Sequence, residues 1–202
     1  MFSPLLKQLC KDLSGLPGIG PKSAQRIAFE LLRHRRPQAE SLARSLQSAM
    51  QQIGYCQHCR TFTEENLCQI CAGGSRDKQL LCVVENPVDM LAIEQSGHFK
   101  GYYFVLHGNL SPIDGIEPED LELDKLQELV IEHQVIEVIL ATNSSVEGEA
   151  TAYYISELLE CLDNKHPNLK FTRLAKGIPI GSELEFMDGH TLGLALLDRK
   201  PL

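Results

Sequence analysis

Four of the seven cysteines form a dense cluster along the chain. Cys56 and Cys59 are separated by two residues, Cys68 and Cys71 by two more, and eight residues lie between the pairs. Two tight turns with this spacing can aim four sulfur atoms at one point, as a tetrahedral Zn²⁺ site requires. Four protein ligands leave no position open for water or substrate. The sequence therefore predicts one structural zinc ion per chain, without chemistry of its own.

The alternative for the cluster is a pair of disulfides. An odd number of cysteines fits a reducing compartment better than a disulfide framework, so we favour the metal. We interpret Cys10, Cys82 and Cys161 as small core residues, and His58, inside the first cysteine pair, as an exposed side chain rather than a fifth ligand. Loss of the metal is expected to loosen residues 54–76 while the rest stays folded.

A second candidate site lies in the stretch Leu-Pro-Gly-Ile-Gly-Pro-Lys that ends at Lys22. Gly18 and Gly20 permit positive φ and expose backbone N–H groups, which suit a phosphate oxygen at the positive end of the following helix. Lys22 and Arg26 lie four residues apart and share the helix face beside this loop. The pattern is similar to the helix-hairpin-helix motif, which holds the DNA backbone without reading bases. The alternative is a purely structural turn.

The distribution of charge supports a nucleic-acid partner. The chain has a net charge of −8, but residues 1–50 carry +5 and the remainder −13. A basic leading segment on an acidic body is expected of a protein that contacts phosphates with one end. No apolar run is long enough to span a membrane, so we expect no membrane partner and a cytoplasmic location.

Periodic patterns predict an α/β chain. We expect three helices: the first ends near residue 14, the second before Pro37, and the third has a pattern that starts at Leu42 and ends near residue 53. Short β-rich runs then alternate with helices, which means a parallel sheet. The runs are 80–84, 102–106, 135–141 and 169–174; the helices are 87–95, 119–133, 148–162 and a last one around 192–197. A long loop is expected over 107–118. The predicted domains are a helix-hairpin-helix region at 1–53, a four-cysteine zinc finger at 54–76, a sheet domain at 79–175 and a C-terminal segment at 176–202.

The sheet domain resembles a Toprim domain, found in topoisomerases, primases and some nucleases. In that family a Glu after the first strand and an Asp-x-Asp pair after the third hold Mg²⁺. Glu85 follows the first predicted strand, but Asn143 and Ser145 stand where the two aspartates would fall, ahead of Glu147 and Glu149.

Neutral amides and hydroxyls are poor Mg²⁺ ligands, so two-metal catalysis is not expected. The two acids after the third strand have a structural explanation, because they fall in the first turn of a helix, where Ser144 and Glu147 fit a capping box. Together with Glu85 they remain candidates for a weak ion or for a partner surface.

Taken in order, these motifs and the tail from Arg173-Leu-Ala-Lys-Gly-Ile-Pro-Ile-Gly to Asp188-Gly-His-Thr-Leu resemble the RecR family of bacterial recombination mediators. The resemblance covers nearly the whole chain. It implies a non-catalytic Toprim domain, homo-oligomers such as a dimer or a tetrameric ring that can encircle DNA, and partners RecO and RecF that help load the recombinase at gaps. It also implies a bacterial cytoplasmic protein that joins the nucleoid when bound to DNA.

The leading hypothesis is a non-enzymatic DNA-binding clamp and scaffold in recombinational DNA repair. A Mg²⁺-dependent Toprim nuclease or primase that uses Glu85 is the alternative, and a zinc-stabilised adaptor without DNA contact is a third possibility. The sequence contains no phosphate-binding P-loop that would support nucleotide hydrolysis.

Overall fold

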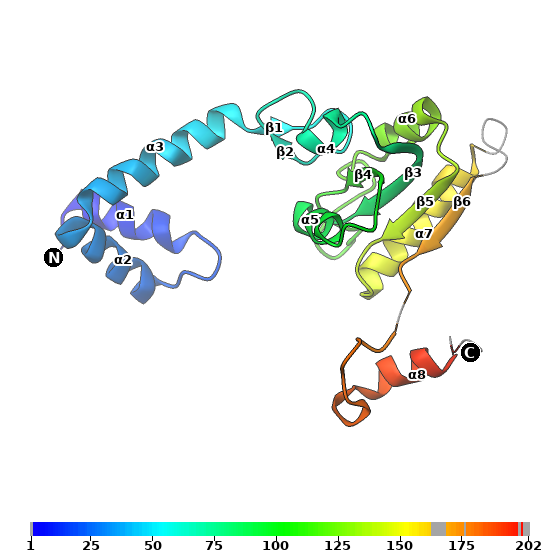
Figure 1. Cartoon of the computed structure of the whole chain (residues 1–202). Coiled ribbons are helices and arrows are strands. Elements are labelled where there is room, and N and C mark those ends of the chain that lie inside the picture. Colours follow the sequence, from blue (N-terminus) through cyan, green and yellow to red (C-terminus); the bar gives the residue numbers. More distant parts are fainter. Residues whose placement is uncertain (1, 163–168, 176, 198, 200–202) are drawn as a thin grey trace. The chain divides into compact units, whose positions relative to one another are not determined.

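The computed structural model describes residues 2–162, 169–175, 177–197 and 199. Contacts within the chain divide it into two units, one ending at Ile53 and one beginning at Gly54. Figure 1 labels the helices and strands of both units. Within the described ranges, none of the helices has the length and apolar character needed to cross a bilayer.

The first unit consists of three helices: α1 (Pro4–Ser14), α2 (Pro21–His34) and α3 (Arg36–Gln52). Ser3 caps α1, since its hydroxyl accepts a hydrogen bond from the Leu6 N–H. The side chains of Ala24 and Ala28 are completely buried, so small residues let α2 pack closely against α1. The expected helical hairpin is therefore present.

The third helix begins earlier than the predicted pattern at residue 42. It starts at Arg36, and Pro37 lies in its first turn, where the missing N–H of proline breaks no helical hydrogen bond. Pro37 thus starts α3, whereas the sequence interpretation used it only as the end of α2.

The second unit begins with the cysteine segment and continues into a parallel sheet. A short antiparallel pair, β1 (Gly54–Tyr55) and β2 (Phe62–Thr63), precedes the one-turn helix α4 (Gln69–Ala72). The sheet strands are β3 (Asp77–Val84), β4 (Gly101–Val105), β5 (Glu137–Ala141) and β6 (Lys170–Arg173), in the spatial order β4-β3-β5-β6 and all parallel. The predicted parallel α/β architecture is confirmed.

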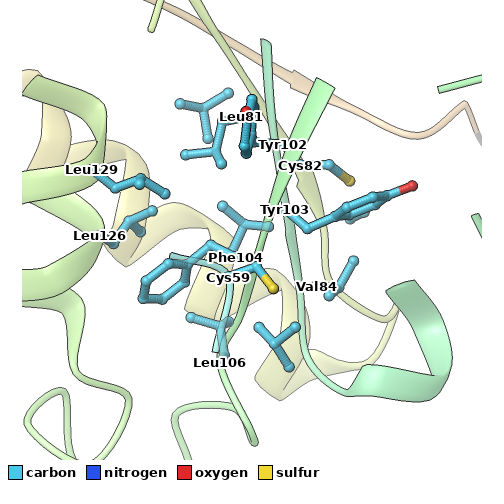
Figure 2. Packing of buried hydrophobic residues seen from close by; sticks show 14 of the residues in the cluster. Cys59, Leu81, Cys82, Val84, Tyr102, Tyr103, Phe104, Leu106, Leu126 and Leu129 are labelled. Carbon is cyan, nitrogen blue, oxygen red and sulfur yellow. The ribbon is translucent and has the colours of Figure 1, made fainter. Parts of the chain in front are cut away.

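Three helices connect the strands: α5 (Pro87–Gln95), α6 (Leu123–His133) and α7 (Val146–Glu160). Right-handed crossovers with this strand order place α6 and α7 on one face of the sheet and α5 on the other. Leu126 and Leu129 of α6 accordingly lie on the opposite side of the strands from the Tyr103 ring in Figure 2. The expected loop after β4 is present, with one bridge between Ser111 and Ile116. A 3₁₀ turn (Leu184–Phe186) and α8 (Gly189–Leu197) follow the sheet.

The hydrophobic core joins the sheet and the cysteine segment. Buried strand residues such as Leu81 and Phe104 belong to the same cluster as the four clustered cysteines, and Figure 2 shows Cys59 among them. Of the other three cysteines, only Cys82 is a core residue. Cys10 is half-buried and Cys161, just beyond the end of α7, is exposed, so the interpretation of all three as core residues was wrong.

Candidate functional site

The four clustered cysteines converge as their spacing predicts. Cys56 follows β1, a tight turn leads to Cys59, and Cys68 caps α4, which carries Cys71. All four are buried, and their sulfur atoms lie within 4.8 Å of one another. Four thiols without oxygen ligands form the donor set of a closed tetrahedral zinc site. The residues present therefore fit the ion that the sequence predicts.

Hydrogen bonds from a backbone N–H group and between the thiols shift the pKa values of the clustered cysteines. The N–H of Cys68 donates to the sulfur of Cys56 at 3.3 Å, which stabilises negative charge there. The pKa of the Cys56 thiol is lowered because the thiols of Cys59, Cys68 and Cys71 donate to its sulfur, and the pKa of Cys71 is raised because its own proton is shared with Cys56. Four thiolates at this separation repel one another, so their joint ionisation requires a cation between them, a charge that a bound zinc ion would supply.

Arg60 anchors the cysteine segment to the sheet. It has a positive φ of 64° directly after Cys59, and its side chain is almost fully buried. Its guanidinium donates to the carbonyl oxygens of Val105 at 3.0 Å and Leu121 at 2.8 Å, and Nε lies 3.2 Å from a carboxylate oxygen of Glu122. Burial lowers the pKa of Arg60 and the Glu122 carboxylate raises it, so the group stays charged and paired.

Sequence reasoning missed this role of Arg60. A single arginine after a cysteine pair carries no periodicity, and its partners are carbonyl groups about 45 to 61 positions further along the chain, which only the fold brings near. The sequence offered one indication of this role: Arg60 directly follows Cys59 in a tight turn, where a long cationic side chain is unexpected unless it binds a partner elsewhere.

The glycine loop and the basic residues of the first unit also lie together. Gly18 has φ 78°, a conformation that favours glycine, and Gly20 caps α2 without a side-chain hydrogen bond. Apart from the adjoining residues, no atom of the described part of the chain lies within 4 Å of a Cβ built on either glycine, so the loop surface is open. Lys22 and Arg26 are exposed on the first turns of α2 beside it. The structure thus brings the four predicted residues to one end of α2.

A shallow groove of about 400 Å³ runs along the same helix. It is lined by Lys22, Gln25, Arg26, Phe29, Glu30, Arg33 and His34. Within the described residues, Lys22, Arg26 and Arg33 form no ion pair, whereas Arg35 is paired with Glu30 at 3.2 Å. Three cations on one groove with a helix N-terminus at its end can bind a run of phosphates.

At the carboxyl edge of the sheet, Glu85 is buried and held by amides. The backbone N–H of Asn143 donates to one carboxylate oxygen at 2.8 Å, and the Asn143 side-chain amide donates to the other at 2.6 Å. The side-chain amide of Asn109 adds a third donor at 3.3 Å. Gly148 leaves room for this arrangement, because a Cβ there would lie 2.8 Å from Glu85 Oε1. Amide donors therefore contact both carboxylate oxygens and would compete with a metal ion for their lone pairs.

The other two acids at this edge are arranged differently. Glu147 is exposed in the first turn of α7, and Glu149 forms an ion pair with Arg173 at 3.1 Å. With Glu85 they do not form a cluster of ligand atoms within 4.8 Å of one another. The N-cap residue of α7 is Ser145, whose hydroxyl accepts a hydrogen bond from the Gly148 N–H at 3.0 Å. The predicted capping box of Ser144 and Glu147 was therefore wrong, because the helix is capped one residue later.

Models of known protein families match several parts of the chain. Family models match residues 6–50 (RecR, helix-hairpin-helix), 53–73 (RecR, four-cysteine zinc finger domain), 79–175 (Toprim domain) and 177–200 (RecR, C-terminal). The recombination protein RecR of Saccharophagus degradans is 50% identical over 202 residues, which is 100% of both chains. The expectation of a protein that is not an enzyme is in keeping with this likeness. The chain therefore belongs to the RecR family of recombination proteins.

Proposed function

We propose that the chain is a non-enzymatic DNA-binding clamp and scaffold in recombinational DNA repair. The observation that carries the proposal is the groove of α2, where Lys22, Arg26 and Arg33 have no acidic partner among the described residues and the open Gly18–Gly20 loop lies at one end. Cations and backbone N–H groups contact phosphates in any sequence, so binding is sequence-independent.

The sheet edge supports a scaffold better than a nuclease or primase. A carboxylate that accepts three amide hydrogen bonds and a neutral Asn143 in the place of an aspartate are a poor Mg²⁺ site. We propose that this edge, with Glu147 exposed on it, takes part in binding RecO and RecF while the recombinase is loaded at gaps. Membership of the RecR family supports that role.

An apolar face on α3 supports assembly into a homo-oligomer, either a dimer or a tetrameric ring. Leu42, Leu46 and Met50 lie at helical spacing on one face and are 52%, 54% and 78% exposed. A face of this kind is stabilised when another copy covers it. Several copies also multiply the few phosphate contacts of each chain, which raises the overall affinity for DNA. We propose one structural zinc ion per chain at the four cysteines, and a cytoplasmic location with association to the nucleoid on DNA.

The test is DNA binding as a function of salt for the wild type and Lys22→Ala/Arg26→Ala. Loss of two phosphate contacts is expected to weaken binding and to reduce the slope of log affinity against log salt by about 1.8 per chain on duplex DNA. Lys78→Ala/Lys100→Ala is the matched control, because it removes two exposed lysines from the second unit.

An unchanged affinity and salt slope in the α2 variant would refute the proposed DNA site. Absence of DNA binding by the wild type at low salt would instead favour an adaptor that binds only proteins. Cleavage or primer synthesis with Mg²⁺ that is lost in Glu85→Ala would favour the enzyme alternative.

A further inference from the structure

A second group of metal-ligating side chains lies beside the cysteine cluster. His58 is in the turn between Cys56 and Cys59, and Glu132 and His133 end α6; their ligand atoms lie within 4.8 Å of one another. We propose that His58, Glu132 and His133 form a second site for a zinc-type divalent cation. Such a cation would link the zinc finger directly to α6.

The strongest support is two buried nitrogen atoms without partners. Nδ1 of His58 and Nδ1 of His133 are both shielded from solvent and have no hydrogen-bond partner among the described residues. His133 is only 7% exposed. Buried polar atoms are nearly always paired, and an imidazole nitrogen that lacks a hydrogen-bond partner is a natural metal ligand. His58 is half-buried, so its interpretation as an exposed side chain was wrong.

The surroundings hold the two rings in place. The centroid of the His133 ring is 5.5 Å from that of His58 and 5.0 Å from that of Tyr102, both in edge-to-face contact. Burial lowers the pKa of His133, and the charges of His58 and Lys78 act in the same direction while Glu132 opposes them. The edge-to-face contacts therefore keep the two imidazoles close to one another.

The donor set selects the kind of ion. Two imidazoles and one carboxylate suit Zn²⁺ and related transition-metal ions, whereas Mg²⁺ and Ca²⁺ prefer sites made of oxygen atoms alone. Ligand atoms of a tetrahedral zinc site lie about 3.4 Å apart, so the three side chains, whose ligand atoms lie within 4.8 Å of one another, need to close by at most about 1.4 Å to bind it. Glu132 is exposed and can make most of that movement. Three protein ligands leave a fourth position open to water.

The experiment counts zinc on the full chain. Protein that already holds one zinc ion per chain is equilibrated with increasing free Zn²⁺, and bound metal is measured for the wild type and for Glu132→Gln, His58→Ala and His133→Gln. The wild type is expected to bind a second equivalent, and each variant to bind it more than about tenfold more weakly, because even indirect supports of a metal site are worth that much. His98→Gln, which changes an exposed histidine of the same unit, is the control and should bind as the wild type does.

Cobalt substitution separates the two sites. Only the cysteine site shows thiolate-to-Co²⁺ charge-transfer absorption, so that band should keep its intensity in all three variants. Glu132→Gln changes an exposed side chain and keeps its shape, so it tests the proposal even if a histidine variant fails to fold. A wild-type chain that binds only one zinc ion up to millimolar Zn²⁺, or a second equivalent with the same affinity in Glu132→Gln, would overturn the second site.

Discussion

At the residue scale, Asn143 determines whether Glu85 at the carboxyl edge of the sheet needs a bound cation. In place of a second carboxylate it presents two N–H donors to Glu85, one from its backbone and one from its side chain. A buried carboxylate with these donors is stable without a cation, because its charge is spread over hydrogen bonds. The side-chain contact would become repulsive if the neutral amide were exchanged for an acid, whereas the backbone N–H would still donate.

Asn143→Asp is therefore expected to destabilise the second unit by about 2–3 kcal/mol at pH 7. Two carboxylates in contact raise the pKa of one of them in the folded state above its unfolded value. The loss is thus full above that raised pKa and disappears as the pH falls below about 4. Urea unfolding at several pH values measures it, and added Mg²⁺ should restore part of the stability.

Ser144→Asp serves as the control for Asn143→Asp, because Ser144 is exposed and no hydrogen bond joins it to Glu85. It should change the unfolding free energy by less than about 0.5 kcal/mol. Equal effects of the two variants, or a loss that does not depend on pH, would contradict the proposed role of the Asn143 amide.

At the scale of elements, the zinc finger is part of the sheet's core. The sequence interpretation treated residues 54–76 as a segment that could loosen by itself. In the structure, the Val105 N–H at the end of β4 donates to the Cys59 carbonyl at 2.9 Å. The Arg60 guanidinium donates to the carbonyls of Val105 and Leu121, which lie before and after the loop that follows β4. Loosening the finger therefore exposes polar groups of the sheet domain as well.

Arg60→Met tests this connection. It keeps most of the aliphatic length but removes the donors, and it leaves the carbonyls of Val105 and Leu121 buried without their partner. The expected loss is about 3 kcal/mol in the free energy of unfolding, measured with urea. Arg44→Met on the exposed surface of α3 should have almost no effect. A wild-type stability in Arg60→Met would show that these hydrogen bonds are replaceable.

Removal of zinc from the cysteine site is expected to loosen both the cysteine segment and the end of β4 that it contacts. Chelation should increase amide hydrogen exchange not only in residues 54–76 but also at the carboxyl end of β4, because the Cys59 and Arg60 contacts depend on the folded turn. Exchange at the centre of β5, which makes no contact of this kind with the finger, is the internal reference. Faster exchange confined to residues 54–76 would support the original expectation of an independent segment.

At the scale of the whole molecule, the proposed DNA binding uses few phosphate contacts per chain, so the proposed assembly is important for affinity. Unit 1 offers basic residues on α2 and an uncovered apolar face on α3, while the remainder of the chain is acidic. An acidic body repels DNA, which supports the proposal that DNA binding is confined to the basic unit.

Leu46→Glu is expected to lower the average mass of the protein in solution and, through loss of avidity, to weaken DNA binding at least about tenfold, because a charge on an apolar contact face opposes association. Analytical ultracentrifugation and DNA binding measure the two effects. Gln47→Glu adds the same charge one residue further along α3 and should leave the mass unchanged. An unchanged mass in Leu46→Glu would place the contact between copies elsewhere.

The sequence alone determined the features that depend on local patterns. The cysteine spacing, the glycines around a helix start and the alternation of apolar runs predict the zinc ligands, the hairpin and the parallel sheet, because each pattern reflects contacts within a few residues or a regular period. Helix α5 was predicted with its observed bounds, 87–95, since Pro87 and Asn86 signal its start directly.

Only the tertiary structure decided which distant side chains meet. Three sets of contacts join residues that are about 24 to 75 positions apart in the sequence. They are the hydrogen bonds of Arg60 with Val105, those of Asn143 and Asn109 with Glu85, and the ring contact of His58 with His133. No short pattern encodes such pairs, because their distance depends on how strands and helices pack rather than on spacing along the chain. The sequence therefore predicted which four cysteines lie together as possible metal ligands, and the fold determined what holds that cluster to the rest of the protein.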